Sequence, residues 1–213
     1  MGKSYESRAY SFEVRADCGE KGATLTGRPI VYDSKTDIGP FDEVIERGAL
    51  DGANLKDVRF LVNHDTSRIP LARSRNNNAN STMQLTPDKD GLQVRVSLDV
   101  ENNADARALY SAVRRGDVSG MSFMFSVSED DWADIDTEHP TRTIKRIGEV
   151  VEVSAVTFPA YAETDIIADE RRALDSARAA LDSARAARAS VPDGNGLALQ
   201  QARNRIIAII GGM

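Results

Sequence analysis

Cysteine and histidine, the side chains that proteins most often use to bind transition metals, are scarce in this chain. Among 213 residues there is one cysteine, Cys18, and there are two histidines, His64 and His139. A single cysteine cannot form an intramolecular disulfide, and this set is too small for a Cys/His metal cluster. We therefore expect no metal, no cofactor and no disulfide framework, which fits a reducing cytoplasm.

Long apolar runs and excess positive charge are also missing. No stretch approaches the roughly 18 consecutive apolar residues that span a bilayer, and residues 1–6 contain no apolar signal segment. The formal net charge of −6 disfavours a surface that neutralises phosphates. The sequence therefore predicts neither a membrane nor a nucleic-acid partner.

The first 165 residues are dominated by strand patterns and contain one clear helix. Asn102 or Asn103 can cap a helix over 104–115 that Gly116 ends, whereas 41–50 is read as a helical turn or a loop and 129–131 as an acidic turn. These signals predict an α+β fold, a mostly antiparallel, largely closed β-barrel with peripheral helices. The expected strands are 10–14, 23–27, 58–62, 82–86, 92–98, 122–127, 143–147 and 150–158.

Composition changes after Tyr161, where residues 166–213 form a predicted helical tail. Two similar heptads predict a helix over 168–190, and a second amphipathic helix is expected over 197–210. Leu174 and Leu181 are seven residues apart and give a narrow apolar seam. This seam suits either a partner helix or loose packing on the barrel.

Two short segments offer the groups of a nucleophilic site. His64 follows the apolar run Phe60-Leu61-Val62, and Ser122 lies in Gly120-Met121-Ser122-Phe123-Met124-Phe125. A serine hydroxyl becomes a good nucleophile when a neighbouring imidazole accepts its proton. Sequence spacing alone fixes no geometry, so His64 could equally be a strand-end histidine bonded to Asp65.

Five ordered blocks resemble the prohead (capsid-maturation) proteases of tailed bacteriophages, which are related in fold to the herpesvirus assembly proteases. The resemblance covers about residues 10–165, and the last two blocks are the most specific. The blocks are Gly27-Arg28-Pro29-Ile30-Val31-Tyr32, Glu43 to Ala49, Asn63-His64-Asp65 with Pro70 to Ser74, Gly120 to Phe125, and Glu152 to Tyr161.

The resemblance implies a serine endopeptidase that removes scaffold or delta segments from capsid proteins, and finally digests itself. Ser122 is then the nucleophile and His64 the general base. The expected partner is capsid or scaffold protein inside the immature capsid in the bacterial host cytoplasm, and a homodimer or higher oligomer is possible. The alternative is a catalytically silent assembly factor that binds scaffold, and cleavage specificity stays open.

The third catalytic group is less well defined. Glu152 is the first choice, because on an extended strand it shares a face with Ser154 and could accept the distal imidazole N–H; otherwise it is a solvent-facing charge. Glu149 is a weaker candidate. His139 is weaker still, since it lies in an expected hairpin turn, although the related viral enzymes use a second histidine.

The remaining polar residues near these blocks are expected to have structural or supporting roles. Ser119 is expected to be a turn residue and Asp65 to stabilise a loop. The acidic clusters at 129–131 and 134–136 lack the spacing of a calcium loop. Oxyanion donors could come from a turn at Arg73-Ser74 or from the chain near Ser122.

Overall fold

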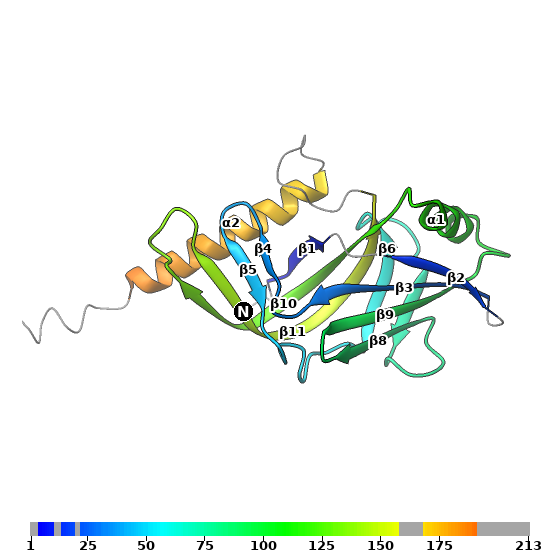
Figure 1. Ribbon diagram of the computed structural model, residues 1–213, viewed down its shortest axis with the longest axis horizontal. Helices are drawn as coiled ribbons and strands as arrows, with labels where there is room; N and C mark the ends of the chain where they lie inside the picture. The colour runs from blue at the N-terminus through cyan, green and yellow to red at the C-terminus, as the bar shows by residue number, and fades with distance from the viewer. Residues whose placement is uncertain (1–3, 11–13, 20–21, 158–167, 191–213) are drawn as a thin grey trace, which may run out of the picture.

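The structure is a computed structural model that describes residues 4–10, 14–19, 22–157 and 168–190 (Figure 1). These residues form two sheets and two helices. The larger sheet contains β1 (Glu6–Tyr10), β4 (Lys35–Asp37), β5 (Asp42–Ile45), β6 (Asp57–Val62), β7 (Ala72–Arg75), β10 (Gly120–Ala133) and β11 (Thr141–Val156). The smaller sheet contains β2 (Arg15–Gly19), β3 (Gly22–Val31), β8 (Met83–Asp88) and β9 (Gly91–Leu98), and the helices are α1 (Ala104–Arg115) and α2 (Ala168–Ala189).

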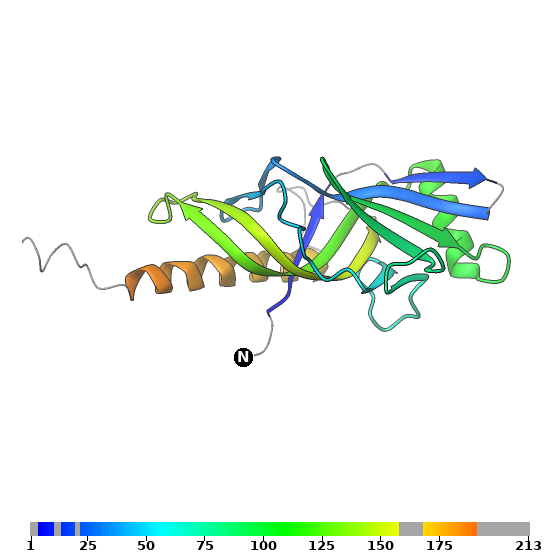
Figure 2. The same cartoon turned by 90° about the horizontal axis from the view of Figure 1, so that it is seen from below.

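The predicted closed barrel is wrong for the described strands, which form an α+β fold with two separate sheets (Figure 2). The larger sheet runs β1-β10-β11-β5-β4 with β6 and β7 as a branch from β11, so β1, β4 and β7 are its outer strands. β5 and β6 both pair in parallel with β11, at 141–144 and 152–155 respectively, and β7 pairs with β6. Sequence alternation predicts which face of a strand is buried, but not which strand edges join.

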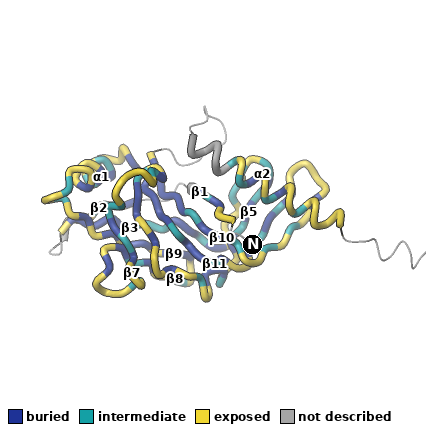
Figure 3. Tube along the Cα trace, turned by 180° about the vertical axis from the view of Figure 1, so that it is seen from behind, coloured by how far each residue is buried: buried dark blue, intermediate teal, exposed yellow. Residues whose placement is uncertain are grey.

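Both sheets contribute to one apolar core (Figure 3). The smaller sheet supplies fully buried side chains such as Leu25 and Val94, and the larger sheet supplies Phe60, Phe123 and Val153. The alternating pattern of 92–98 therefore does bury one face, as the sequence predicted, because β9 turns Leu92, Val94, Val96 and Leu98 inward.

The acidic turn predicted at 129–131 is instead part of β10. The strands predicted at 143–147 and 150–158 belong to the single strand β11 as far as Val156, and Phe158 lies outside the described residues. The hairpin tolerates these charges because they form ion pairs across the two strands. Asp130 Oδ2 lies 2.6 Å from Arg142 Nε, Glu129 pairs with Arg146, and Asp131 pairs with Lys145.

The beginning of the chain also differs from the prediction. Of the strand expected at 10–14, only Tyr10 belongs to a strand; Val14 does not, and 11–13 lie outside the described residues. β1 instead covers Glu6–Tyr10 and pairs antiparallel with β10. The sequence pattern did not predict this strand, because its inward-facing residues Glu6 and Arg8 are polar. They are buried because they form ion pairs. The 41–50 segment, expected to be helical or a loop, contains β5 followed by turns.

Helix α1 has the predicted bounds and caps. Asn103 accepts hydrogen bonds from the N–H groups of Asp105 and Ala106, and Gly116 ends the helix with φ 83°. Ala106, Leu109 and Val113 are buried against the core. These local signals were sufficient to predict the bounds of α1, because both capping residues directly flank the helix in the sequence.

Helix α2 runs along the β10–β11 hairpin, at the opposite end of the molecule from α1 (Figures 1 and 2). Ala177 and Leu181 are buried against Phe41 and Ile135. Arg185 donates to the carbonyls of Ile135 and Thr137. The apolar seam thus packs on the same chain, which was one of the two interpretations of the heptads.

The helix predicted at 197–210 lies outside the described residues. Within the part that is described, no helix combines the length and apolar character needed to span a bilayer.

We predict that Leu181→Ala loosens α2 without unfolding the rest of the molecule. Truncating a buried leucine costs about 2–5 kcal/mol, and Leu181 is buried in the small cluster that holds α2. Amide hydrogen exchange should accelerate in α2 but not in α1. Arg178→Ala, on the exposed side of α2, is the matched control, and equal exchange rates in the two variants would contradict this packing.

Candidate active site

Ser122 lies in the middle of the larger sheet, between two antiparallel neighbours. Its pairing partners are Ala9 on β1 and Ser154 on β11. Ser122 has 0% exposure, and its Oγ lies 2.6 Å from His64 Nε2. The structure therefore brings together the hydroxyl and the imidazole that the sequence analysis selected.

A strained turn carries His64 to this position. β6 ends at Val62, and both Asn63 and His64 have positive φ, at 49° and 56°. Positive φ is uncommon for residues other than glycine, so it requires compensating contacts. Asn63 Oδ1 accepts from Thr157 N–H at 3.0 Å, and His64 N–H donates to Ser154 Oγ at 3.0 Å. Both bonds tie the turn to the end of β11.

Glu152 completes a chain of three polar groups. Its Oε2 is hydrogen-bonded to His64 Nδ1, on the side of the imidazole away from Ser122. Glu152 is buried, so the alternative of a solvent-facing strand charge is wrong. A carboxylate at Nδ1 fixes the tautomer that leaves Nε2 free to accept a proton.

Ser154 is a site residue that the sequence analysis did not select. It donates a hydrogen bond to Glu152 Oε1 while accepting one from the backbone of His64. Ser154 therefore orients both the carboxylate and the turn. The signal was present in the sequence, because two-residue alternation places Ser154 on the same face as Glu152.

The weaker candidates have other partners. Glu149 accepts hydrogen bonds from the Tyr5 hydroxyl and the Asn54 amide. Asp65 accepts from the backbone and hydroxyl of Ser67, so the loop-stabilising interpretation is confirmed. Ser119 accepts a backbone hydrogen bond from Val14.

His139 lies near the end of the β10–β11 hairpin in a cluster with Asp37 and Asp42. Its Nε2 lies 3.2 Å from Asp42 Oδ1, and candidate ligand atoms of the three residues lie within 4.8 Å of one another. The ammonium group of Lys35 lies 2.5 Å from Asp42 Oδ2, so a cation already balances this carboxylate. Hydrogen bonds from Lys35 lower the pKa of Asp42, and His139 adds to this effect.

The segment proposed for the oxyanion donors is not a turn. Arg73 and Ser74 belong to β7, which pairs with β6. The Arg73 N–H donates to Thr82 Oγ1, and the Ser74 hydroxyl donates to the Leu55 carbonyl. These groups are therefore engaged in holding β7 in place.

A buried ion network flanks the Ser122 strand. Arg8 of β1 donates to both carboxylate oxygens of Glu43, at 2.7 and 2.9 Å, and Arg142 bridges Glu6, Glu43 and Asp130. Burial by itself would raise the pKa of Glu6, but hydrogen bonds and charges from Arg142 and Arg8 outweigh it and hold this pKa below its usual range. Glu6 therefore stabilises β1 at neutral pH, and this contribution is lost as the pH falls through the lowered pKa.

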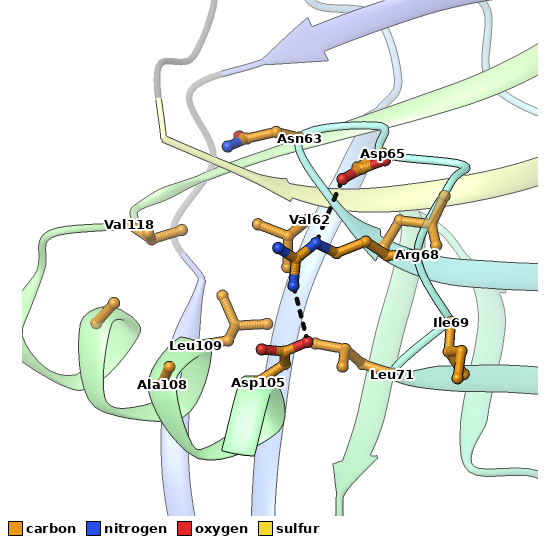
Figure 4. Close-up of a pocket in the computed structure, with 12 residues that line it drawn as sticks. Val62, Asn63, Asp65, Arg68, Ile69, Leu71, Asp105, Ala108, Leu109 and Val118 are labelled. Atoms are coloured by element: carbon orange, nitrogen blue, oxygen red, sulfur yellow. Dashed lines mark hydrogen bonds and ion pairs between the residues drawn. The ribbon is translucent and has the colours of Figure 1, made fainter. Parts of the chain in front are cut away.

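A mostly apolar pocket of about 400 Å³ opens beside the His64 turn (Figure 4). Arg68 lies across it, 3.5 Å from Asp65 and 3.0 Å from Asp105. Ile69 on its rim is 86% exposed, which is unusual for a large aliphatic side chain. The walls come from β6, α1 and the segments before β7 and β10, and include Val62, Leu71, Ala108, Leu109, Ala112 and Val118.

The buried hydroxyl, imidazole and carboxylate form an arrangement that can activate a serine in a hydrolase. Comparison with known families gives a specific assignment. The family model for the caudovirus prohead serine protease matches residues 10–178. The chain therefore belongs to the family of caudovirus prohead serine proteases, as its sequence blocks indicated.

Individual proteins are also similar to this chain. The prohead protease of Enterobacteria phage HK97 is 33% identical over 129 residues, which are 59% of this chain and 52% of that protein. The chain thus spans about half the length of this curated relative. The bacteriophage T4 capsid assembly protease has a solved structure that covers 72% of this chain and 99% of its own, with 13% identity and a TM-score of 0.38.

We predict that Ser154→Ala slows the reaction of Ser122 with a fluorophosphonate by about tenfold, the effect of losing one hydrogen bond to a charged group. The change leaves Glu152 and His64 present but less well oriented. Ser74→Ala is the matched control, because Ser74 is equally buried but bonds to Leu55. Equal labelling rates for the two variants would argue against an orienting role for Ser154.

Proposed function

We propose that this chain is a serine endopeptidase of phage capsid maturation, with Ser122 as nucleophile, His64 as general base and Glu152 as the orienting acid. The observation that carries the proposal is the continuous contact from the Ser122 hydroxyl through the His64 ring to the Glu152 carboxylate. Family membership supports proteolysis as the reaction.

The mechanism follows from this geometry. His64 Nε2 accepts the hydroxyl proton as Ser122 Oγ attacks the carbonyl carbon of a peptide bond, and the resulting imidazolium is stabilised by Glu152. The same imidazolium then protonates the departing amine, which leaves an acyl-enzyme. Water, deprotonated by His64, hydrolyses the ester and restores the serine.

The family and one relative support a choice of substrate. The family is that of the caudovirus prohead serine protease, and the HK97 relative is named a prohead protease. We therefore propose that this chain cleaves capsid or scaffold protein, and also copies of itself, inside the immature capsid in the host cytoplasm. The apolar pocket beside the His64 turn provides space for a substrate side chain.

We predict that Ser122→Ala and His64→Ala abolish cleavage of a co-expressed capsid-protein precursor, and that Glu152→Gln lowers the rate by up to about 10⁴-fold because the imidazole loses its orienting acceptor. Electrophoresis and mass spectrometry of the precursor measure the result.

Ser119→Ala and His139→Ala serve as controls, since the Ser119 hydrogen bond to Val14 uses a backbone carbonyl that alanine retains, and His139 contacts Asp42 outside the triad. Cleavage that persists in Ser122→Ala would come from a host protease. If the wild-type chain leaves the precursor uncut while binding it, the alternative of a catalytically silent assembly factor would replace this proposal.

A further inference from the structure

Strand β1 covers the nucleophile. It pairs antiparallel with β10 from Glu6↔Phe125 to Tyr10↔Met121, which places Ala9 opposite Ser122. The carbonyl oxygen of Arg8 lies 2.7 Å from Ser122 Oγ. With Ser122 at 0% exposure and His64 at 9%, an external peptide cannot reach the hydroxyl while β1 is in place.

The same contact opposes activation of the serine. A serine hydroxyl has one proton to donate, and here two acceptors compete for it, the Arg8 carbonyl and His64 Nε2. The Ser7 hydroxyl also lies 3.4 Å from His64 Nε2. β1 therefore occupies the site and holds the proton that Ser122 must transfer to His64.

β1 also has the form of a bound peptide. It is an outer strand of the sheet, and its hydrogen-bonding partner along Met121–Phe125 is the strand that carries the nucleophile. An extended peptide can add to a strand edge through the same backbone hydrogen bonds. If β1 moves away, β10 presents this edge for five residues around Ser122.

The residue that supplies the carbonyl to Ser122 also has a specific side-chain partner. Arg8 is 2% exposed and donates to both oxygens of Glu43, which is 1% exposed. Its guanidinium carbon lies 5.9 Å from the centre of the Phe125 ring. When β1 leaves, Glu43 loses these two charge-assisted bonds and Arg142 loses its bonds to Glu6, so Arg142 stays beside Glu43. A basic side chain on a substrate strand can restore the two bonds to Glu43 where the Arg8 guanidinium makes them, whereas a neutral side chain leaves this charge-assisted contact unmade.

We propose that the substrate binds as an outer strand on β10 in the position now held by β1, and that Glu43 selects a basic side chain immediately before the cleaved bond, where Arg8 now lies. The proposal rests on the proposed function and specifies its substrate. Because β1 and substrate compete for one strand edge, displacement of β1 limits activity.

The first test measures cleavage of peptides that have Arg, Lys, Leu or Glu immediately before the cleaved bond. The wild-type chain should prefer Arg and Lys. Glu43→Gln should lower the ratio of kcat/KM for these two peptides to kcat/KM for the Leu peptide by at least about thirtyfold, as expected when one partner of a buried charge pair is removed. Fluorophosphonate labelling of Ser122, which involves no basic side chain, should not slow in Glu43→Gln.

The second test fixes β1 in place. Ser7 and Met124 are cross-strand partners, so Ser7→Cys with Met124→Cys, in a Cys18→Ser background, can join β1 to β10 by a disulfide. The oxidised form should lose peptide cleavage and labelling at least about tenfold, and reduction should restore both. Each single cysteine variant, which cannot form the bond, is the control for oxidation.

The outcomes separate the two proposals. Absence of Ser122-dependent cleavage in every variant would overturn the proposed function. Ser122-dependent cleavage that shows no preference for Arg and Lys, or that continues at full rate in the oxidised double-cysteine variant, would overturn this inference and leave the proposed function intact.

Discussion

The register between β10 and β11 is the constraint on which the candidate site depends. Ser122 is paired with Ser154, and Glu152 lies two residues away on the same face of β11. The other edge of β11 pairs with β6, where Val62 lies opposite Ala155 just before the turn that carries His64. One long strand therefore positions all three groups. A slip of one residue in either pairing would turn Ser122 or Glu152 to the opposite face.

Local strain at His64 is compensated by this same strand. Two consecutive residues with positive φ are unfavourable outside glycine, yet both make hydrogen bonds to the end of β11. Ser154 serves both sides of the arrangement, because its hydroxyl accepts from the His64 backbone and donates to Glu152. Backbone position and side-chain orientation are therefore coupled through one hydroxyl group.

The sequence predicted elements whose causes are local. Helix α1 has its predicted bounds because Asn103 and Gly116 supply the end signals within the segment itself. Ser122, His64 and Glu152 were selected from short ordered blocks, and the structure brings them into contact. Their catalytic roles remain proposals, whereas their proximity is a structural observation.

What the sequence did not predict depends on partners far apart in the chain. β1 was missed because Glu6 and Arg8 do not resemble an apolar strand face, and their burial depends on Glu43 and Arg142. The length of β10 was missed because acidic residues indicate a turn unless basic residues of β11 lie opposite them. The prediction of a closed barrel was wrong for the same reason, because no local sequence pattern determines which strand edges pair.

The ion network gives β1 a property that an apolar strand would lack. An apolar strand is held by burial, which is non-directional and tolerates many replacements. Arg8 is instead held by a planar, two-point hydrogen-bonded contact with Glu43, which a lysine can meet only in part and a neutral side chain cannot meet at all. The contact that fixes β1 over Ser122 is therefore chemically selective. A strand edge with this selectivity can distinguish among the peptides that compete for it, because a peptide without a basic side chain restores the backbone hydrogen bonds but not the charge-assisted contact with Glu43.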